Sequence, residues 1–211
     1  MTRWAGRAGA LHARPILIAN AVSRLDAIAP AVVLGRAQRI GPDAEARAAA
    51  AGVDIVRRRS GGSAVWVGPG ECLWVDVVLA RGRPDWEDDV GRAGCWMGDA
   101  WAAALAEVGI GDCTVHRAAM VHAPGSDTVC FAGKGPGEVF THDGAKIVGI
   151  SQRRTRDWAL FQCAVPLRWD PAPLIAILGG AAAAAAGAAV QTVTPSVAED
   201  LVAALARKVR T

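Results

Sequence analysis

Apolar residues recur along this chain in short runs that are separated by turn-forming segments. Residues 31–35 form an apolar, β-branched run that predicts a buried strand, and residues 53–56 predict the next one. Between them, residues 41–43 (Gly-Pro-Asp) predict a turn that begins a helix over residues 44–51. Residues 158–167 are again apolar and predict a strand late in the chain.

Helical periodicity is strongest in two segments. Residues 96–108 place Met97, Trp101, Leu105 and Val108 on one stripe, which predicts a helix, and residues 195–209 predict an amphipathic helix at the end of the chain. Residues 16–28 also predict a helix because Ala21, Leu25 and Ile28 share a face, whereas residues 1–14 are basic and small and predict no regular element.

Turn signals predict two hairpins. Residues 63–79 contain two strand-like runs around Gly68-Pro69-Gly70, and Asp143-Gly144 is a tight turn before a strand that begins at Lys146. Residues 113–117 and 139–140 are further short strands. Strands interspersed with helices are typical of an α+β or an α/β fold, and the pattern alone leaves both open.

Residues 173–190 carry no charge and are just long enough to raise the question of a membrane span. Gly179-Gly180 interrupts the stretch, and most of its other residues are alanine, which is only weakly apolar. We therefore expect an Ala-rich helix packed on the domain and no membrane partner.

Length and charge narrow the class of protein. A chain of 211 residues is expected to form one domain over residues 1–211, and a formal net charge of +3, from 23 basic and 20 acidic residues, does not indicate a nucleic-acid partner. The five cysteines form no Cys-x-x-Cys pair, which argues against a disulfide framework and against zinc, and the N-terminal residues show no secretory signal. We expect a reduced, cytoplasmic protein with no metal site.

Two polar segments are candidates for chemistry. Residues 143–154 read Asp-Gly-Ala-Lys-Ile-Val-Gly-Ile-Ser-Gln-Arg-Arg, and residues 57–65 read Arg-Arg-Arg-Ser-Gly-Gly-Ser-Ala-Val. Glycines let a backbone or a ligand approach closely, and lysine and arginine can bind anionic groups. Without further information, a solvated hairpin and a turn with surface arginines are the favoured interpretations of these segments.

Both segments resemble signatures of the lipoate–protein ligase and octanoyltransferase superfamily, Gly-x-Lys-Ile-x-Gly-x-Ser-Gln-Arg-Arg and Arg-Arg-x-Ser-Gly-Gly-x-Ala-Val. A third block, residues 32–38, resembles the strand end that precedes them in that family. The resemblance implies an α+β catalytic domain with a mixed β-sheet, related to the class II aminoacyl-tRNA synthetase core. Only about forty residues follow the matched region, so the C-terminal accessory domain of larger ligases is expected to be absent.

The resemblance also implies a set of site residues. Lys146 is the family's central lysine, and it is implied to stabilise the reacting carbonyl oxygen. The other residues implied to bind the acyl group are Arg58, Ser60, Gly61, Gly62, Ala64, Gly149, Ser151 and Gln152.

Cys130 decides between two mechanisms. It lies sixteen positions before Lys146, in the neighbourhood where cysteine-dependent octanoyl and lipoyl transferases carry a nucleophile. The Arg-rich loop continues with Trp66-Val67-Gly68 where many family ligases have an aromatic-His-Asp group, which makes this branch the closer resemblance. A buried structural cysteine is the alternative interpretation of Cys130.

Three functions therefore stay open. The first is an acyltransferase of protein lipoylation that needs no cofactor and moves an octanoyl or lipoyl group from an acyl carrier or a lipoylated protein, through Cys130. The second is a lipoate–protein ligase that needs ATP and Mg. Either would modify a lipoyl-domain protein, such as a 2-oxoacid dehydrogenase E2 or the glycine-cleavage H protein. The third is a non-catalytic acyl-binding homologue.

Overall fold

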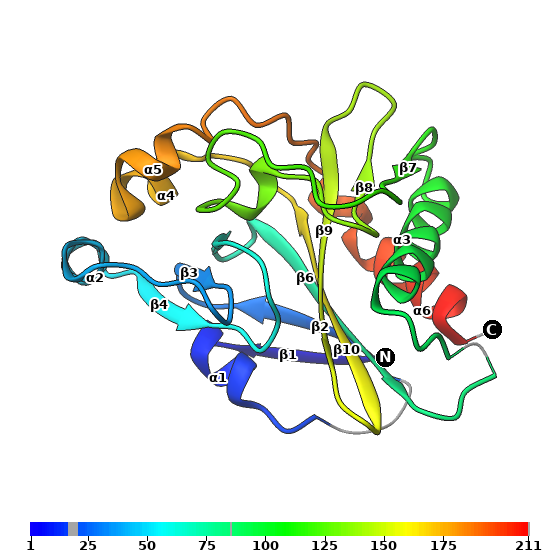
Figure 1. Cartoon of the computed structure of the whole chain (residues 1–211). Helices are drawn as coiled ribbons and strands as arrows, with labels where there is room; N and C mark the ends of the chain where they lie inside the picture. Colours follow the sequence, from blue (N-terminus) through cyan, green and yellow to red (C-terminus); the bar gives the residue numbers. More distant parts are fainter. Residues whose placement is uncertain (17–20, 85, 211) are drawn as a thin grey trace.

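Two β-sheets face one another in the computed structural model, which describes residues 1–16, 21–84 and 86–210. Within these residues the larger sheet has seven strands in the order β1-β2-β6-β10-β9-β8-β7, and it runs through the centre of the molecule (Figure 1). Its strands are β1 Thr2–Gly6, β2 Ala21–Ala27, β6 Cys72–Ala80, β7 Thr114–Val115, β8 Val139–Phe140, β9 Lys146–Arg154 and β10 Trp158–Pro166. The β1–β2 pair is parallel and the other pairs are antiparallel, so the sheet is mixed.

The smaller sheet has the order β4-β3-β5, with β3 Ala31–Leu34, β4 Asp54–Arg57 and β5 Val65–Val67. Three helices lie beside it: α2 Pro42–Ala50, α4 Ala172–Leu178 and α5 Gly180–Ala183. Their apolar side chains and those of β3 form one core cluster, which fixes the small sheet as a platform for the loops that follow β3 and β4.

The two long helices, α3 Val90–Glu107 and α6 Ala198–Arg210, cover one face of the large sheet (Figure 1). Alternation along β6 explains this arrangement. Leu73, Val75 and Val77 pack in the core cluster that contains both helices, while Trp74 and Asp76 lie on the opposite face, toward the small sheet. The short helix α1 Ala8–Ala13 and the single-turn helices Cys130–Ala132 and Pro195–Val197 complete the fold.

The α+β class with a mixed sheet is confirmed. The strands predicted over residues 31–35, 53–56 and 158–167, and the helices predicted over residues 44–51 and 195–209, are present with small shifts at their ends. The helix predicted over residues 96–108 is also present, but it begins six residues earlier, at Val90. The Asp143-Gly144 turn before β9 is also confirmed, with Gly144 at φ 85°.

Two predictions at the N-terminus are wrong. Residues 1–14 contain β1 and α1, and residues 21–27 form strand β2 where a helix was expected; residues 17–20 of that predicted helix lie outside the described residues. Leu25 and Ala27 alternate with the polar Arg24 and Asp26, and both neighbouring strands of β2 supply hydrogen-bonding edges. Sheet pairing therefore overrode the local preference for a helix.

Two further predictions need correction. The strands of residues 63–79 exist but do not form a hairpin, because β5 pairs with β3 whereas β6 pairs with β2 and β10, so the chain crosses between sheets at the Gly-Pro-Gly turn. The uncharged stretch of residues 173–190 forms two short helices rather than one, because Gly179 has φ 82°. Among the residues with described positions, no helix is long and apolar enough to cross a membrane.

Candidate functional site

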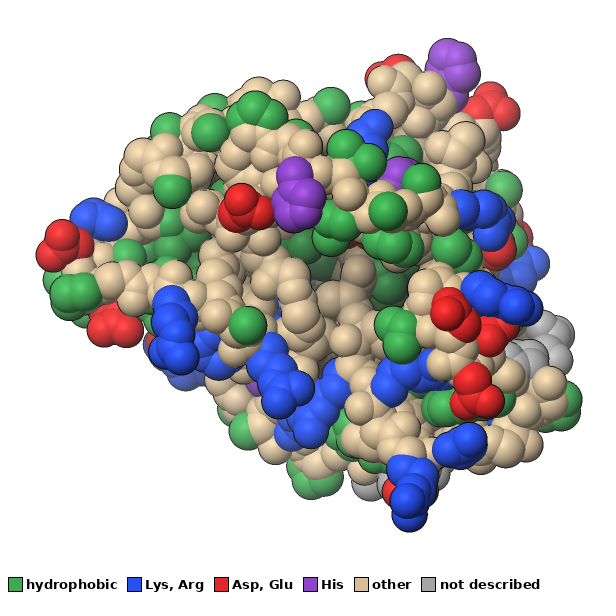
Figure 2. Space-filling model, in the orientation of Figure 1, with side chains coloured by type: hydrophobic (Ala, Val, Ile, Leu, Met, Phe, Trp, Pro, Cys, Tyr) green, Lys and Arg blue, Asp and Glu red, His purple; other side chains and the backbone are tan. Residues whose placement is uncertain are grey.

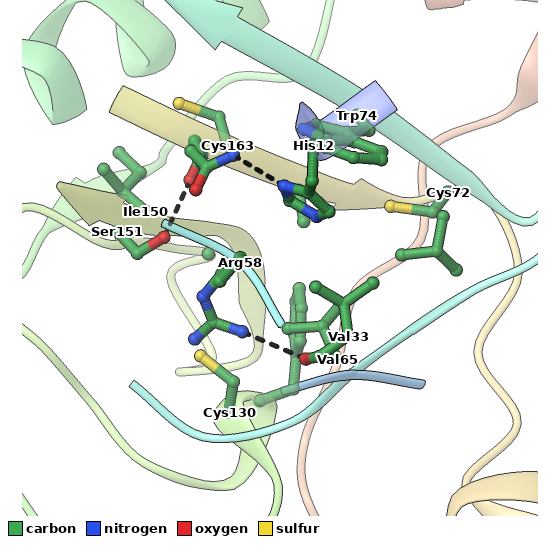
Figure 3. A pocket seen from close by; sticks show the side chains of 15 residues that line it. His12, Val33, Arg58, Val65, Cys72, Trp74, Cys130, Ile150, Ser151 and Cys163 are labelled. Carbon is green, nitrogen blue, oxygen red and sulfur yellow. Dashed lines mark hydrogen bonds between the residues drawn. The ribbon is translucent and has the colours of Figure 1, made fainter. Parts of the chain in front are cut away.

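A mainly apolar pocket lies between the two sheets, on the face of the large sheet that α3 and α6 leave open (Figure 3). We call it the acyl pocket, after the acyl group that the family resemblance implies for this site. Its walls come from α1, both sheets and the Cys130 turn: His12, Val33, Arg58, Val65, Val67, Cys72, Trp74, Cys130, Phe131, Gly149, Ile150, Ser151, Gln162, Cys163 and Ala164. Such a lining suits a hydrocarbon chain with a few polar groups that orient it.

The main chain holds Cys130 at one side of this pocket. Ala64 donates from its N–H to the carbonyl of Thr128 at 2.9 Å, and its own carbonyl accepts the N–H of Cys130 at 2.9 Å. Ala64 is fully buried, so a predicted binding residue positions the Cys130 turn through its backbone.

Three cysteines line the pocket, and their surroundings differ. Burial raises the pKa of Cys72 to about 12 and raises the pKa of Cys163 as well, so both stay neutral thiols at physiological pH. Cys130 instead lies beside the guanidinium of Arg58 (Figure 3). Because a cation next to a thiol can activate it as a nucleophile, Cys130 is the candidate for that role among the three.

Lys146 is almost fully buried, and its Nζ donates to the carbonyl oxygen of Cys130 at 2.9 Å. The same ammonium lies 2.7 Å from Oε2 of Glu138, whose pKa is raised by burial against the opposing attraction of Lys146. The structure thus brings the two predicted catalytic residues together, with Lys146 directly behind the main chain of Cys130.

Arg58 and Gly62 shape the pocket next to the thiol. The Arg58 guanidinium donates to the carbonyl of Gly61 at 2.6 Å and to that of Val33 at 3.1 Å, and burial lowers its pKa while the charges of Cys130 and Glu138 raise it. Gly62 has φ +91°, and a Cβ at this position would lie 2.7 Å from Arg58 Nη2 and 3.8 Å from Cys130 Sγ. A side chain at Gly62 would therefore disturb both groups.

A chain of hydrogen bonds joins the two sheets across the pocket. Ser60 Oγ donates to Gln162 Oε1 at 2.8 Å and shares a hydrogen bond of 2.7 Å with Ser151 Oγ. The predicted binding residues Ser60 and Ser151 are therefore neighbours. Gly149 forms the wall next to Phe131, because a Cβ there would lie 3.3 Å from the ring.

A second cavity, the basic groove, opens beside the first. It is lined by Arg36, Ala37, Arg59, Gly61, Gly62, Gln152, Arg153 and Arg154. Both polar atoms of the Gln152 side-chain amide are buried and have no hydrogen-bond partner in the described part of the chain. Lys and Arg side chains also form a run below a central hollow on the face shown in Figure 2. The groove offers charge and hydrogen bonds to an anionic group.

Sequence reasoning missed three polar residues of the site. Glu138 lies opposite the Gly149 region because the next residue, Val139, pairs with Val148. The signal that could have identified Glu138 was its position in a Gly-rich stretch next to a predicted short strand. Gln162 lies in a run that reads as apolar core. His12 comes from α1, in a segment for which no element was predicted.

Comparison with known proteins gives a consistent result. The family model described as "Lipoyl protein ligase A/B catalytic domain" matches residues 19–211. No curated protein matches the chain.

Three solved structures show the same fold. The bi-partite lipoate protein ligase from Thermoplasma acidophilum, studied with its E2 lipoyl domain, has a TM-score of 0.65 at 18% identity and covers 89% of this chain and 68% of its own. A lipoate-protein ligase A bound with ATP has a TM-score of 0.63 at 16% identity, and the match covers 89% of this chain and 70% of the ligase. A T. acidophilum protein with bound lipoic acid has a TM-score of 0.64 at 17% identity, and the match covers 89% of this chain and 69% of that protein. These likenesses confirm the expected catalytic-core fold.

Proposed function

This chain belongs to the family of lipoyl protein ligase A/B catalytic domains, and we propose that it is an acyltransferase that moves an octanoyl or lipoyl group through a thioester on Cys130. The acceptor is a lysine of a lipoyl-domain protein, and the donor is an acyl thioester on a carrier or a lipoylated protein. One observation carries the proposal. Cys130 lies in the apolar pocket beside Arg58, and its carbonyl oxygen accepts a hydrogen bond from Lys146.

The reaction balances without an oxidant or a nucleotide. In the first step the Cys130 thiolate attacks the donor carbonyl, the new C–S bond forms, and the donor thiolate leaves and takes up a proton. In the second step the acceptor amine attacks the Cys130 thioester, a C–N bond forms, the amine loses a proton and the thiolate is restored.

Three charged side chains of the site each have a task in this scheme. Arg58 balances the thiolate, and its two carbonyl contacts hold it in place. Lys146 anchors the Cys130 turn and supplies positive charge near the carbonyl oxygen on which negative charge develops. The buried carboxylate of Glu138 fixes the ammonium of Lys146.

The basic groove supports an anionic partner next to the acyl pocket. Arg36, Arg59 and Arg153 line it together with Gln152, whose side-chain amide has no hydrogen-bond partner among the described residues. A phosphate-bearing carrier arm matches this chemistry, and so do the phosphates of ATP. The second candidate function, an ATP-dependent lipoate–protein ligase, rests on this groove; bound ATP would supply activation of a free carboxylate, and Arg36 and Arg153 would hold its phosphates.

A transfer assay with a purified lipoyl domain separates these functions. We expect acylation of the lipoyl-domain lysine by an octanoyl carrier protein without ATP. Modification by lipoate only in the presence of Mg-ATP would favour the ligase. Acyl binding without modification under either condition would favour a non-catalytic homologue. Cytoplasmic localisation is part of the proposal, because thioester chemistry at Cys130 needs a reduced thiol.

A further inference from the structure

His12 introduces a polar side chain into the acyl pocket from outside the family pattern. It lies on α1, and the family match begins only at residue 19. The residue is 7% exposed, and its ring packs against Trp74 with a centroid separation of 4.4 Å. In Figure 3, His12 and Trp74 lie across the pocket from Cys130. A hydrocarbon chain that begins at Cys130 would therefore extend toward His12.

Gln162 fixes which ring nitrogen of His12 carries the proton. Gln162 Oε1 accepts the hydrogen bond from Ser60 Oγ at 2.8 Å, so its amide nitrogen points the other way. That nitrogen lies 3.4 Å from His12 Nδ1 and also donates to the buried carboxylate of Asp76. Because an amide nitrogen can only donate, Nδ1 must accept, and the proton of the neutral ring sits on Nε2.

The ring stays neutral under physiological conditions. Burial, and to a lesser extent the positive charges of Arg58, Arg14 and Arg59, together lower the pKa of His12 to about 3. His12 therefore offers one N–H group and no charge.

The Nε2 atom is buried and has no hydrogen-bond partner among the residues whose positions are described. An unsatisfied buried donor destabilises the protein, and a ligand that accepts a hydrogen bond from it recovers part of that loss. Saturated hydrocarbon cannot accept a hydrogen bond, whereas a sulfur atom can accept a weak one. Two ligands of similar length would thus differ in how they satisfy this site.

We propose that His12 is a specificity-determining residue, whose Nε2–H favours an acyl tail that carries a hydrogen-bond acceptor, such as the dithiolane sulfur of a lipoyl group, over a saturated octanoyl tail. The inference rests on the proposed acyl-transfer function. It deepens that function by ranking the two acyl groups that the family pattern leaves equal.

The test compares equilibrium binding of lipoamide and octanamide, two neutral amides, to the whole chain. The wild type is expected to bind lipoamide about tenfold more tightly, which corresponds to about 1.4 kcal/mol. His12→Phe keeps an aromatic ring but removes the donor, so the preference should disappear through weaker lipoamide binding. His122→Phe, at an exposed histidine paired with Asp127, is the matched control and should keep the preference.

The outcomes distinguish the inference from the function on which it rests. An unchanged ratio of affinities in His12→Phe overturns the role of His12 and leaves the proposed function standing. Failure of the wild type to bind either amide overturns the proposed function and this inference together.

A second measurement needs no variant. Nitrogen-15 NMR of the imidazole in the wild type should show the Nε2–H tautomer with no titration between about pH 5 and pH 8. Lipoamide should shift the Nε2 resonance, and octanamide should not. An Nδ1–H tautomer, or equal shifts with both amides as expected for a displaced water, would contradict the proposal.

Discussion

Glu138 and Lys146 form an ion pair of 2.7 Å inside the protein, with side-chain exposures of only 5% and 1%. The ammonium of this pair also donates to the Cys130 carbonyl, so a buried pair is connected directly to the proposed nucleophile. Breaking such a pair by removing one partner leaves an uncompensated buried charge, which is strongly destabilising.

The first prediction follows from this pair. Lys146→Met should lose at least about 100-fold in kcat/KM for acyl transfer, the scale of a lost charge-stabilising donor, and about 3–5 kcal/mol of unfolding free energy. Glu138→Gln/Lys146→Met should be equally inactive but recover much of the stability, because no unpaired carboxylate remains. Chemical denaturation and transfer assays on both variants measure this. Equal stability of the single and double variants would contradict the pairing.

The same variants predict a pH dependence. The pKa of Glu138 is raised above its ordinary value of 4.5 in the folded state. At pH values between the ordinary pKa and the folded-state pKa, the native protein therefore binds more protons than the unfolded chain. Stability therefore falls as pH rises through this window. Lys146→Met should lose stability more steeply with rising pH than the double variant, in denaturation series at several pH values.

Gly61 and Gly62 give a matched pair of substitutions. Gly62→Ala places a Cβ at φ +91° and 2.7 Å from Arg58 Nη2, and should cost about 1–2 kcal/mol of stability together with a loss of octanamide affinity. Gly61→Ala meets no atom within 4 Å and should leave both quantities unchanged. Thermal melts and equilibrium binding provide the comparison, and identical behaviour of the two variants would argue against a structured loop at the thiol.

Arg36 and Arg153 test the basic groove. Their replacement by alanine should lower kcat/KM for a carrier-bound acyl donor roughly fivefold at low salt and flatten its ionic-strength dependence. A small acyl thioester without a carrier should react as before. Arg168→Ala, at an exposed arginine that pairs with Glu71, is the control. Losses of the same size with both donors would place the effect in the chemistry rather than in docking.

Burial of His12 is expected to make folding stability depend on pH in the opposite direction. Its folded-state pKa is about 3 against an ordinary 6.5, so between these values the unfolded chain binds more protons and stability falls as pH drops. The wild type should lose up to about 1.4 kcal/mol per pH unit more than His12→Phe below pH 6.5. Parallel acid-denaturation curves for the two proteins would show that His12 is not buried in its neutral form.

The residues of the site were easier to identify from the sequence than the secondary structure of the N-terminus. The Arg-Arg-x-Ser-Gly-Gly and Gly-x-Lys-Ile motifs singled out Arg58, Gly62 and Lys146 through the family resemblance, and all three lie next to Cys130 in the fold. The binding and catalytic roles of these residues stay predictions. Strand β2 was missed because its alanines and leucine favour a helix locally, and only its neighbours in the sheet decide otherwise.

Hydrogen-bond partners that are far apart in the sequence could not be predicted from it. His12 and Gln162 lie 150 positions apart, and Ser60 lies 102 positions from Gln162. Nothing in local periodicity relates such residues. The crossing from β5 to β6 is similar, since a Gly-Pro-Gly turn is compatible both with a hairpin and with a change of sheet.

The central claim is that Cys130 carries the acyl group, and intact-protein mass spectrometry tests it most directly. After mixing with an octanoyl thioester donor without ATP, the wild type and a Cys113→Ser control should each gain one octanoyl mass, which hydroxylamine removes and peptide mapping assigns to Cys130. Cys130→Ala should gain none. Acylation of the lipoyl domain that requires Mg-ATP and survives Cys130→Ala would contradict the account.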